Sequence, residues 1–282
     1  MREQFARMRG LRSSGMIILV LLCLSGAEKT KCPSEHERPD ELVSAGRMLV
    51  KNNRQEEAKT CFAKAVKAHP KYVPALLELG TMESKAQEFD QAVEHLSSAI
   101  RQEITPQALN NLAIVYQDMG SHTDSVNMYR RALKIDEDDA SAHYNLGTAL
   151  EKAGDFKAAV KSYRQAIELE PEEAKYYNNM GGSLAAMNKT ELAERSYKWA
   201  IKLYPKFVDA YYNMGNLHLG TGKVEESIER LEQAIRLNPQ HPKAKSKLAD
   251  AKKELENKME AFKTQVDDAI KKAEKMMKKG EL

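Results

Sequence analysis

The sequence has few aromatic residues, few cysteines and almost no excess of one charge. Aromatic side chains make up 6% of the 282 residues, with one Trp, which argues against a sugar-stacking platform. Lys and Arg number 44 against 41 Asp and Glu, and four Arg against one Glu in residues 1–27 already account for the net charge of +3. Residues 28–282 are therefore neutral, whereas electrostatic phosphate binding needs a basic surplus. The composition excludes nucleic acid as a partner and leaves a helix-rich protein.

Long hydrophobic runs are also missing. Met16–Leu24 holds nine apolar residues, fewer than the roughly 20 that span a bilayer as a helix. This run follows a basic stretch and precedes Ser25-Gly26-Ala27, small residues of the kind that signal peptidase requires. The order predicts a secretory signal peptide over residues 1–27, with an uncleaved anchor as the alternative. After signal removal we expect no integral membrane span.

Two short motifs extend this prediction to a compartment. The chain ends Lys279-Gly280-Glu281-Leu282, similar to the Lys-Asp-Glu-Leu signal that retains soluble proteins in the endoplasmic reticulum. Asn188-Lys189-Thr190 is the one N-glycosylation acceptor in the sequence. We therefore expect residence in the lumen of the endoplasmic reticulum, with plain secretion or a bacterial periplasm as alternatives.

Of the three cysteines, Cys23 leaves with the signal peptide. Cys32 lies in the lead-in over residues 28–38, and Cys61 lies in the first repeat described below. In an oxidising compartment the two either form a disulfide that ties the lead-in to the first helical hairpin, or Cys61 stays free and buried.

The middle of the chain repeats. Small residues recur at intervals of 33 or 34, at Gly46, Gly80, Ala113, Gly147, Gly181 and Gly215. A second small residue follows each after 12 positions, at Ala58, Ala92, Ser125, Ala159, Ala193 and Ser227. Between them stand Asn53, Gln87, Gly120, Gly154, Asn188 and Gly222, of which all but Gln87 readily take the left-handed conformation that ends a helix. A fixed period of this length indicates stacked helical hairpins.

This pattern resembles the tetratricopeptide repeat family, with six repeats over 39–72, 73–105, 106–139, 140–173, 174–207 and 208–241. The resemblance implies an all-α fold, a right-handed superhelical solenoid whose first helices line the concave side. The second repeat is one residue short near Glu103 to Thr105, where we expect an irregular join. Residues 242–282 are expected to form a long C-terminal helix that caps the array.

The predicted groove carries a row of asparagines. One occurs in the first helix of each of the last four repeats, at Asn111, Asn145, Asn179 and Asn213. Thr148 and Asn216 lie beside them. Asn offers a donor and an acceptor, so a ladder without partners inside the monomer could bind the backbone of an extended peptide. It resembles the Asn ladder of the O-linked N-acetylglucosamine transferases; the alternative is that Asn here helps neighbouring helices pack.

A different groove chemistry is matched in part. Tetratricopeptide proteins that clamp acidic chaperone tails use five basic and amide positions, and Asn213, Lys243 and Lys247 fill three of them. Asn178 and Gly182 replace the first pair, so the match is incomplete.

Enzyme readings find little support. The seven histidines are scattered without metal-ligand spacing, and neither a Gly-rich phosphate loop nor a nucleophile elbow occurs. We therefore expect no catalytic residues, no metal and no cofactor.

The C-terminal segment has a heptad pattern. Leu248, Leu255, Phe262, Ala269 and Met276 recur every seven residues, with Met259, Val266 and Ala273 between them. Its first turns should cap the sixth repeat, because a terminal repeat otherwise exposes its apolar face. Beyond them we prefer a solvated arm to a weak homodimer through residues 248–276.

Taken together, these features predict a non-catalytic scaffold or adaptor that binds a protein or extended peptide in its groove, with a lumenal co-chaperone as one such role. One alternative is an auxiliary subunit that presents acceptor proteins to a glycosyltransferase. The other is a structural assembly protein that dimerises through its C-terminal helix.

Overall fold

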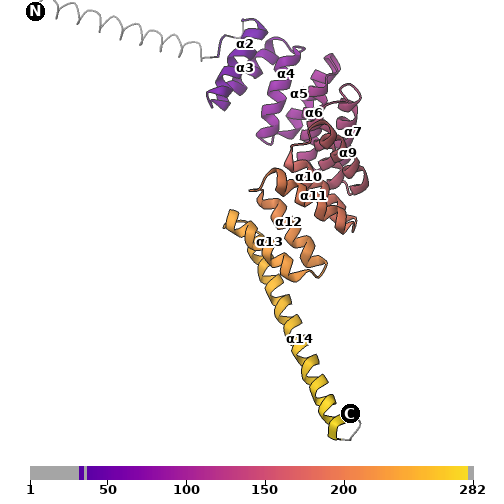
Figure 1. The fold of residues 1–282 in the computed structure, drawn as a ribbon. Coiled ribbons are helices and arrows are strands. Elements are labelled where there is room, and N and C mark those ends of the chain that lie inside the picture. Colours follow the sequence, from indigo (N-terminus) through magenta and orange to yellow (C-terminus); the bar gives the residue numbers. More distant parts are fainter. Residues whose placement is uncertain (1–31, 35–36, 279–282) are drawn as a thin grey trace, which may run out of the picture. The chain divides into compact units, whose positions relative to one another are not determined.

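The computed structural model describes residues 32–34 and 37–278, and within them the chain is entirely helical (Figure 1). The predicted signal peptide and the last four residues lie outside this range. Thirteen helices are described, and none of them is both long and apolar enough to cross a membrane. The predicted all-α repeat fold is thereby confirmed.

The chain divides into two compact units, the first ending at Glu137 and the second beginning at Asp138. Unit 1 contains the helices α2 (Pro39–Lys51), α3 (Gln55–Ala68), α4 (Val73–Lys85), α5 (Phe89–Gln102), α6 (Pro106–Asp118) and α7 (His122–Leu133). Unit 2 contains α8 (Ala140–Lys152), α9 (Phe156–Leu169), α10 (Ala174–Ala186), α11 (Thr190–Leu203), α12 (Val208–Gly220), α13 (Val224–Leu237) and α14 (Ala244–Lys278). Each unit is described by itself below.

In five hairpins one large side chain of the second helix is held against a glycine of the first. A Cβ atom added at Gly147 would lie 2.6 Å from the ring of Tyr163, and one added at Gly181 would lie 2.7 Å from the ring of Tyr197. Real Cβ atoms do not approach so closely, so the small residues are required by packing. Ala159 and Ala193, from the second small row, are fully buried.

The predicted left-handed conformation of the hairpin turns is confirmed, and it also occurs at Gln87, where the sequence did not favour it. All six predicted turn residues have positive φ, including Gln87 at 62°. The residue after each turn donates its backbone N–H back into the first helix, as Glu88 does to the Glu83 carbonyl at 2.9 Å. Asp155 makes the equivalent bond to Leu150 at 2.9 Å. Because this bond forms only across a left-handed residue, Gln87 must adopt the conformation despite its side chain.

The joins between hairpins vary. Four residues, Glu170 to Glu173, separate α9 from α10, but only Glu103 to Thr105 separate α5 from α6. The side chain of Thr105 caps α6 by accepting a hydrogen bond from the Ala108 N–H at 3.2 Å, which satisfies a donor that the helix itself leaves unpaired.

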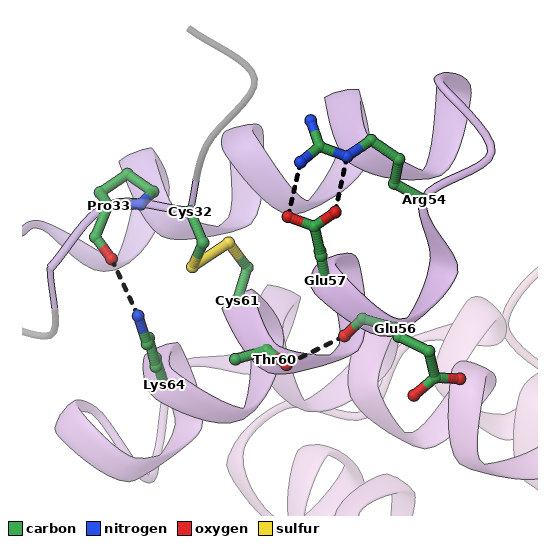
Figure 2. Close-up of a disulfide and its surroundings, with 8 residues drawn as sticks. All are labelled: Cys32, Pro33, Arg54, Glu56, Glu57, Thr60, Cys61 and Lys64. Atoms are coloured by element: carbon green, nitrogen blue, oxygen red, sulfur yellow. Dashed lines mark hydrogen bonds and ion pairs between the residues drawn. A yellow bond between two sulfur atoms is a disulfide. The ribbon is translucent and has the colours of Figure 1, made fainter. Parts of the chain in front are cut away.

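A disulfide joins Cys32 to Cys61 in unit 1 (Figure 2). Their Cα atoms lie 5.5 Å apart, within the usual range for such a bridge. Cys61 is fully buried in α3, and Lys64 of the same helix donates to the Pro33 carbonyl at 3.3 Å. The lead-in is thus held on the first hairpin by one covalent and one polar contact.

The last helix, α14, packs on α13 at its start and then extends away from the other helices of unit 2 (Figure 1). Ala244 and Ala251 are fully buried in its first turns, where it packs on α13. Lys258 makes a late contact, donating to the Gly222 carbonyl at 2.8 Å. From Met259 to Lys272 every side chain is exposed, so this part of the helix covers nothing in its own chain.

Candidate functional site

The predicted asparagines lie on a face of the first helices where neighbouring repeats meet. We call the positions Glu78, Asn111, Asn145, Asn179 and Asn213 the Asn row. The positions three residues further along each helix, Arg47, Thr81, Ile114, Thr148, Gly182 and Asn216, form the adjacent row. On a helix, residues three apart share a face, so within each unit the two rows lie side by side.

In unit 1 the two rows bridge neighbouring repeats. Arg47 Nε lies 2.6 Å from Glu78 Oε1 in the next repeat. Asn111 donates its side-chain amide to Thr81 Oγ1 at 3.0 Å. An adjacent-row side chain of one repeat thus contacts an Asn-row side chain of the following repeat, and the contact occupies the surface between them.

In unit 2 the Asn row is also tied to its neighbours. Asn179 donates to the Tyr144 hydroxyl at 3.1 Å, and Asn213 donates to Asn178 Oδ1 at 3.0 Å. Asn178 donates in turn to Asn179 Oδ1 at 3.1 Å. The expectation that ladder asparagines have no partner inside the monomer is therefore wrong for Asn111, Asn179 and Asn213. Adjacent first helices stack closely enough for a short amide to reach from one repeat to the next.

A hollow of about 440 Å³ opens between α10 and α12. It is lined by Gly182, Ala185, Ala186, Asn188, Thr190, Tyr197, Asn213, Asn216, Leu217, Gly220 and Thr221. The adjacent row holds Gly182 here, where the second and fourth repeats hold Thr81 and Thr148. Because Gly182 has no side chain to extend toward Asn213, the space between the two helices stays open.

The glycines of the hollow face open space. A Cβ atom at Gly182 would meet only the Tyr197 hydroxyl, at 3.9 Å, and one at Gly220 would meet nothing within 4 Å. Neither position has the positive φ that would demand glycine. Packing therefore explains Gly181 but does not explain its neighbour Gly182.

The polar groups in the hollow are neutral hydrogen-bonding groups. Asn216 is exposed, and among the described residues neither its side chain nor the Asn213 carbonyl oxygen has a hydrogen-bond partner within the chain. Burial raises the pKa of Tyr197, with the nearby Glu151 carboxylate adding to the effect. Its phenol therefore stays protonated at neutral pH and offers a donor.

Several predicted site residues lie elsewhere. Thr148 donates to the Tyr144 carbonyl at 3.2 Å and accepts from the Tyr163 hydroxyl at 3.4 Å. Lys243 is exposed just before α14, and Lys247 pairs with Asp250 at 3.5 Å. None of these three residues lines the hollow, and Asn145 is half-buried in α8.

Asn188, the predicted glycosylation site, lies at the rim of the same hollow. It is exposed on the turn between α10 and α11, with φ of 58°. The structure thus brings Asn188 together with Asn213 and Asn216. Gly182 and Gly220 are among the lining residues that the sequence analysis did not select. Their sequence signal is that glycine stands where the fourth repeat carries Thr148 and Lys152.

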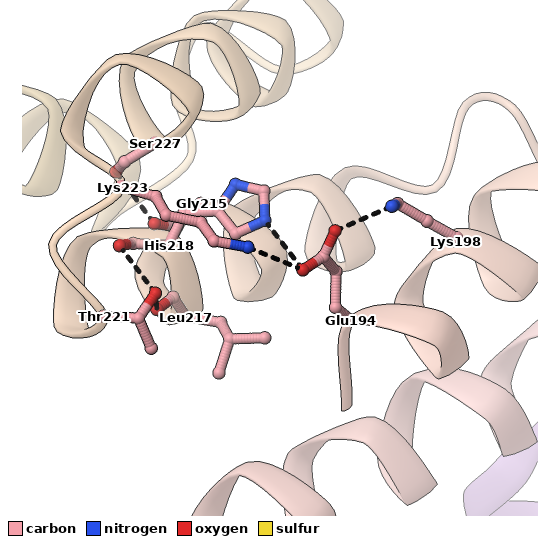
Figure 3. A network of polar contacts seen from close by, with 8 residues as sticks. All are labelled: Glu194, Lys198, Gly215, Leu217, His218, Thr221, Lys223 and Ser227. Atoms are coloured by element: carbon pink, nitrogen blue, oxygen red, sulfur yellow. Dashed lines mark hydrogen bonds and ion pairs between the residues drawn. The ribbon is translucent and has the colours of Figure 1, made fainter. Parts of the chain in front are cut away.

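A polar cluster beside the hollow links α11 to α12 (Figure 3). Glu194 lies 2.7 Å from Lys198 Nζ, 3.3 Å from Lys223 Nζ and 3.7 Å from His218 Nε2. Hydrogen bonds from the two lysines lower the pKa of Glu194 to about 2. The Glu194 carboxylate is ionised at neutral pH. Because its partners come from both helices, the cluster holds α11 against α12. Among the described residues no group of His, Cys, Asp and Glu could hold a metal ion.

The fold and the paired rows define a class, the helical-hairpin repeat proteins. Family models described as tetratricopeptide repeat match residues 43–109, 104–172, 178–242 and 212–261. The chain therefore belongs to the tetratricopeptide repeat family. No curated protein matches it.

Solved structures with the same fold are similar to this chain. YrrB, titled a tetratricopeptide protein with an unusual peptide-binding site, shares 23% identity over 68% of this chain and 97% of its own, with a TM-score of 0.57. PilF of Pseudomonas aeruginosa shares 15% over 75% and 97%, with a TM-score of 0.63. The MamA protein shares 24% over 61% and 94%, with a TM-score of 0.55. At these identities the likeness shows the fold alone.

Proposed function

We propose that this protein is a non-catalytic interaction scaffold that binds an extended peptide at the hollow of unit 2. The observation that carries the proposal is the hollow itself. The hollow is open at Gly182, although helix packing would allow a larger side chain there. It presents Asn213, Asn216 and the Tyr197 hydroxyl. Tetratricopeptide proteins generally mediate protein–protein interactions, which agrees with a binding role.

The lining favours recognition of peptide backbone. Gly182 and two alanines on α10, together with Gly220 on α12, allow a second chain to approach closely. Asn216 and the carbonyl of Asn213 then offer the donor and acceptors that a peptide unit needs. No charged residue lines the hollow, so sequence preference should come from side-chain shape rather than from charge.

The proposal is tested by filling the hollow with a residue that other repeats of this chain carry at the same position. Peptides selected from a random displayed library on the full chain serve as the probe. Gly182→Thr places at this position the residue found at Thr81 and Thr148, and should weaken binding of the selected peptides by about tenfold or more while the melting temperature stays the same. Equal binding by wild type and Gly182→Thr would show that the peptides bind elsewhere.

Two asparagine variants separate binding from folding. Asn216→Ala removes groups without an internal partner, so it should weaken peptide binding without lowering stability. Asn213→Ala also removes the bond to Asn178, so it should cost about 0.5–1.5 kcal/mol of stability as well. If Asn216→Ala binds as well as wild type, backbone recognition at this site is refuted.

We also propose that the protein works in the lumen of the endoplasmic reticulum. The Cys32–Cys61 disulfide supports an oxidising compartment, and Asn188 is exposed as glycan transfer requires. Deleting the last four residues should move the protein into the medium; unchanged retention would count against it. Two narrower roles, a lumenal co-chaperone and a subunit that presents acceptor proteins to a glycosyltransferase, would both bind their protein partner at the hollow.

Assembly through α14 is a second candidate, and one observation favours it. Met259 and Phe262 are 64% and 67% exposed on the predicted seam. In a parallel pair, however, Lys258 of one chain would face Lys263 of the other, which makes pairing weak. Sedimentation across concentration should show a wild-type dimer that Phe262→Glu abolishes; a monomer throughout would exclude this role.

A further inference from the structure

Unit 2 has a second pocket, of about 250 Å³. It shares the helices α10 and α11 with the hollow, but the two sites have no lining residue in common. It is lined by Arg164, Tyr177, Met180, Leu184, Leu192, Arg195, Ser196 and Trp199. Both α9 and α11 pack on α10. The apolar part of the lining comes from α10 and α11: Tyr177, Met180, Leu184, Leu192 and Trp199. Arg164 of α9 and Arg195 of α11 contribute its charge.

The protein's single Trp stands at this pocket. Trp199 is 46% exposed and stacks on Tyr177, with ring centroids 6.2 Å apart and planes inclined by 27°. Lys202 Nζ lies 4.4 Å from its ring centroid. Leu192 of the same helix is 40% exposed. Two large apolar side chains are therefore partly exposed around a pocket that two arginines flank.

The repeat frame shows that packing does not require these residues. The positions equivalent to Trp199 in the other repeats are polar: Lys64, Ser98, Arg131, Gln165 and Gln233. Those equivalent to Leu192 are Glu57, Gln91, Asp124, Ala158 and Glu226. A residue needed for stacking recurs from repeat to repeat, as Ala193 does. Trp199 and Leu192 depart from the frame in the same repeat and at the same pocket.

The charge of the pocket selects the partner. Among the described residues neither Arg164 nor Arg195 has an ion-pair partner, and no Asp or Glu lines the pocket. Guanidinium groups pair with carboxylates in bidentate geometry, and exposed aromatic rings supply the apolar anchor of protein interfaces. We propose that this pocket docks an acidic peptide segment of a partner protein, with one aromatic or aliphatic side chain inserted beside Trp199 and carboxylates on Arg164 and Arg195.

The single Trp also reports occupancy. The probe is a short synthetic peptide with one phenylalanine flanked by aspartates, and its controls carry lysine for each aspartate or alanine for the phenylalanine. Only the first should bind and shift the Trp199 emission to shorter wavelength, because a bound ring removes water from the indole. Binding should weaken as salt rises, since exposed ion pairs are screened. No binding by the acidic peptide, or equal binding by the lysine peptide, would overturn the proposal.

Matched substitutions from sibling repeats test the site without threatening the fold. Leu192→Glu and Arg195→Glu each install a residue that other repeats carry there, at Glu57 and Glu94, and both retain Trp199. Each should weaken binding of the acidic peptide on the order of tenfold. Trp199→Gln, read with a labelled peptide, should do the same. Unchanged affinity in all three variants would refute the site.

The hollow provides the last control. Gly182→Thr should leave binding of the acidic peptide unchanged, because Gly182 does not line this pocket. If Gly182→Thr abolishes that binding while Arg195→Glu does not, the peptide occupies the hollow, and the pocket at Trp199 is not its site.

Discussion

The adjacent row bridges neighbouring repeats in unit 1 and is open at one repeat of unit 2. In unit 1, Arg47 and Thr81 extend to Glu78 and Asn111 of the following repeat and occupy the surface between them. In unit 2 the equivalent residue of the fifth repeat is Gly182, and a hollow remains. The packing rows are the same in both units. Whether a hollow remains at this surface therefore depends on one residue per repeat that helix packing does not fix.

The units also differ in how their ends are secured. Unit 1 begins with a lead-in that a disulfide ties to α3, whereas unit 2 ends with a capping helix that packs on α13 through Ala244 and Ala251. A covalent link restricts the unfolded chain, and a cap buries apolar surface of the terminal repeat. The five predictions that follow test these differences, from the largest expected effect to the smallest.

Loss of the disulfide should affect unit 1 alone. Cys32→Ala removes the bridge and should cost about 2–4 kcal/mol, because the unfolded chain regains the entropy of an open loop. Trp199, the single Trp, lies in unit 2. Circular dichroism should therefore show a lower midpoint for part of the helical signal while the Trp199 fluorescence transition keeps its midpoint. A shift of the fluorescence transition by the same amount would show that the two units unfold together.

Two neighbouring glycines should respond in opposite ways. Gly181→Ala forces a Cβ atom against the Tyr197 ring and should cost about 1–3 kcal/mol through overpacking. Gly182→Ala enters open space and should stabilise α10 by about 0.5–1 kcal/mol, because alanine favours helix over glycine. Urea denaturation of both variants measures the difference. Equal effects would mean that Gly182 is held by packing after all.

Opening the row in unit 1 should reproduce the hollow at a cost. Thr81→Gly removes the acceptor of the Asn111 amide and places glycine in a helix, so it should lose about 1–2 kcal/mol. Gly182→Thr, the reverse change in unit 2, should lose nothing. Chemical denaturation followed by circular dichroism compares the pair. A neutral Thr81→Gly would indicate that the inter-repeat bond contributes little.

The stability of the two units should change with pH in opposite directions. In unit 2 the lysines beside Glu194 lower its pKa from 4.5 to about 2. A depressed carboxyl pKa contributes stability above the unfolded pKa, and this contribution disappears as pH falls from 4.5 toward 2. Because the lysines are exposed, we expect only about 1–2 kcal/mol. Glu194→Gln should flatten the acid limb of the Trp199 fluorescence transition by that amount; an unchanged limb would contradict it.

In unit 1 a hydrogen bond to Glu83 at 2.7 Å raises the pKa of His95, and burial opposes this rise. A raised histidine pKa contributes stability below the unfolded pKa of about 6.5, and the contribution is lost as pH rises through the folded pKa. Wild type should therefore lose some helical stability in unit 1 as pH rises from about 6.5 through the folded pKa of His95. His95→Gln should remove this dependence, and a persisting loss would point to another group.

The smallest expected effect concerns the turns. Gln87 in unit 1 holds a φ of 62°, whereas the equivalent turn of unit 2 uses Gly154 at 84°. Gln87→Gly should stabilise unit 1 by about 0.5–1 kcal/mol by relieving the left-handed strain. Gly154→Ala should destabilise unit 2 by a similar amount. Thermal melts of both variants decide it, and a destabilising Gln87→Gly would show that the Gln87 side chain makes a contact worth more than the strain.

Much of the fold could be predicted because packing rules act at fixed spacing. Gly147 and Ala159 recur in register with their counterparts, since two helices can approach only where side chains are small. The turn at Gly154 follows from the left-handed residue that a closing helix needs. The contacts of the candidate site could not be predicted in the same way. Asn213 and Asn216 both line the hollow, but Asn213 donates to Asn178, a partner that lies 35 residues away and that no local pattern reveals.

The sequence by itself determined which residues form helices, where the hairpins turn and which small residues the stack requires, because each depends on periodicity along the chain. Only the tertiary structure decided which groups remain available to a ligand. A group is available only where the neighbouring repeat leaves it uncovered. Thr81 occupies the amide of Asn111, whereas Gly182 leaves the space beside Asn213 open. It likewise decided that Trp199, an exposed position in the repeat frame, meets Tyr177 and Arg195 in one pocket. Such meetings arise from contacts between helices, and the sequence pattern of a single helix does not contain them.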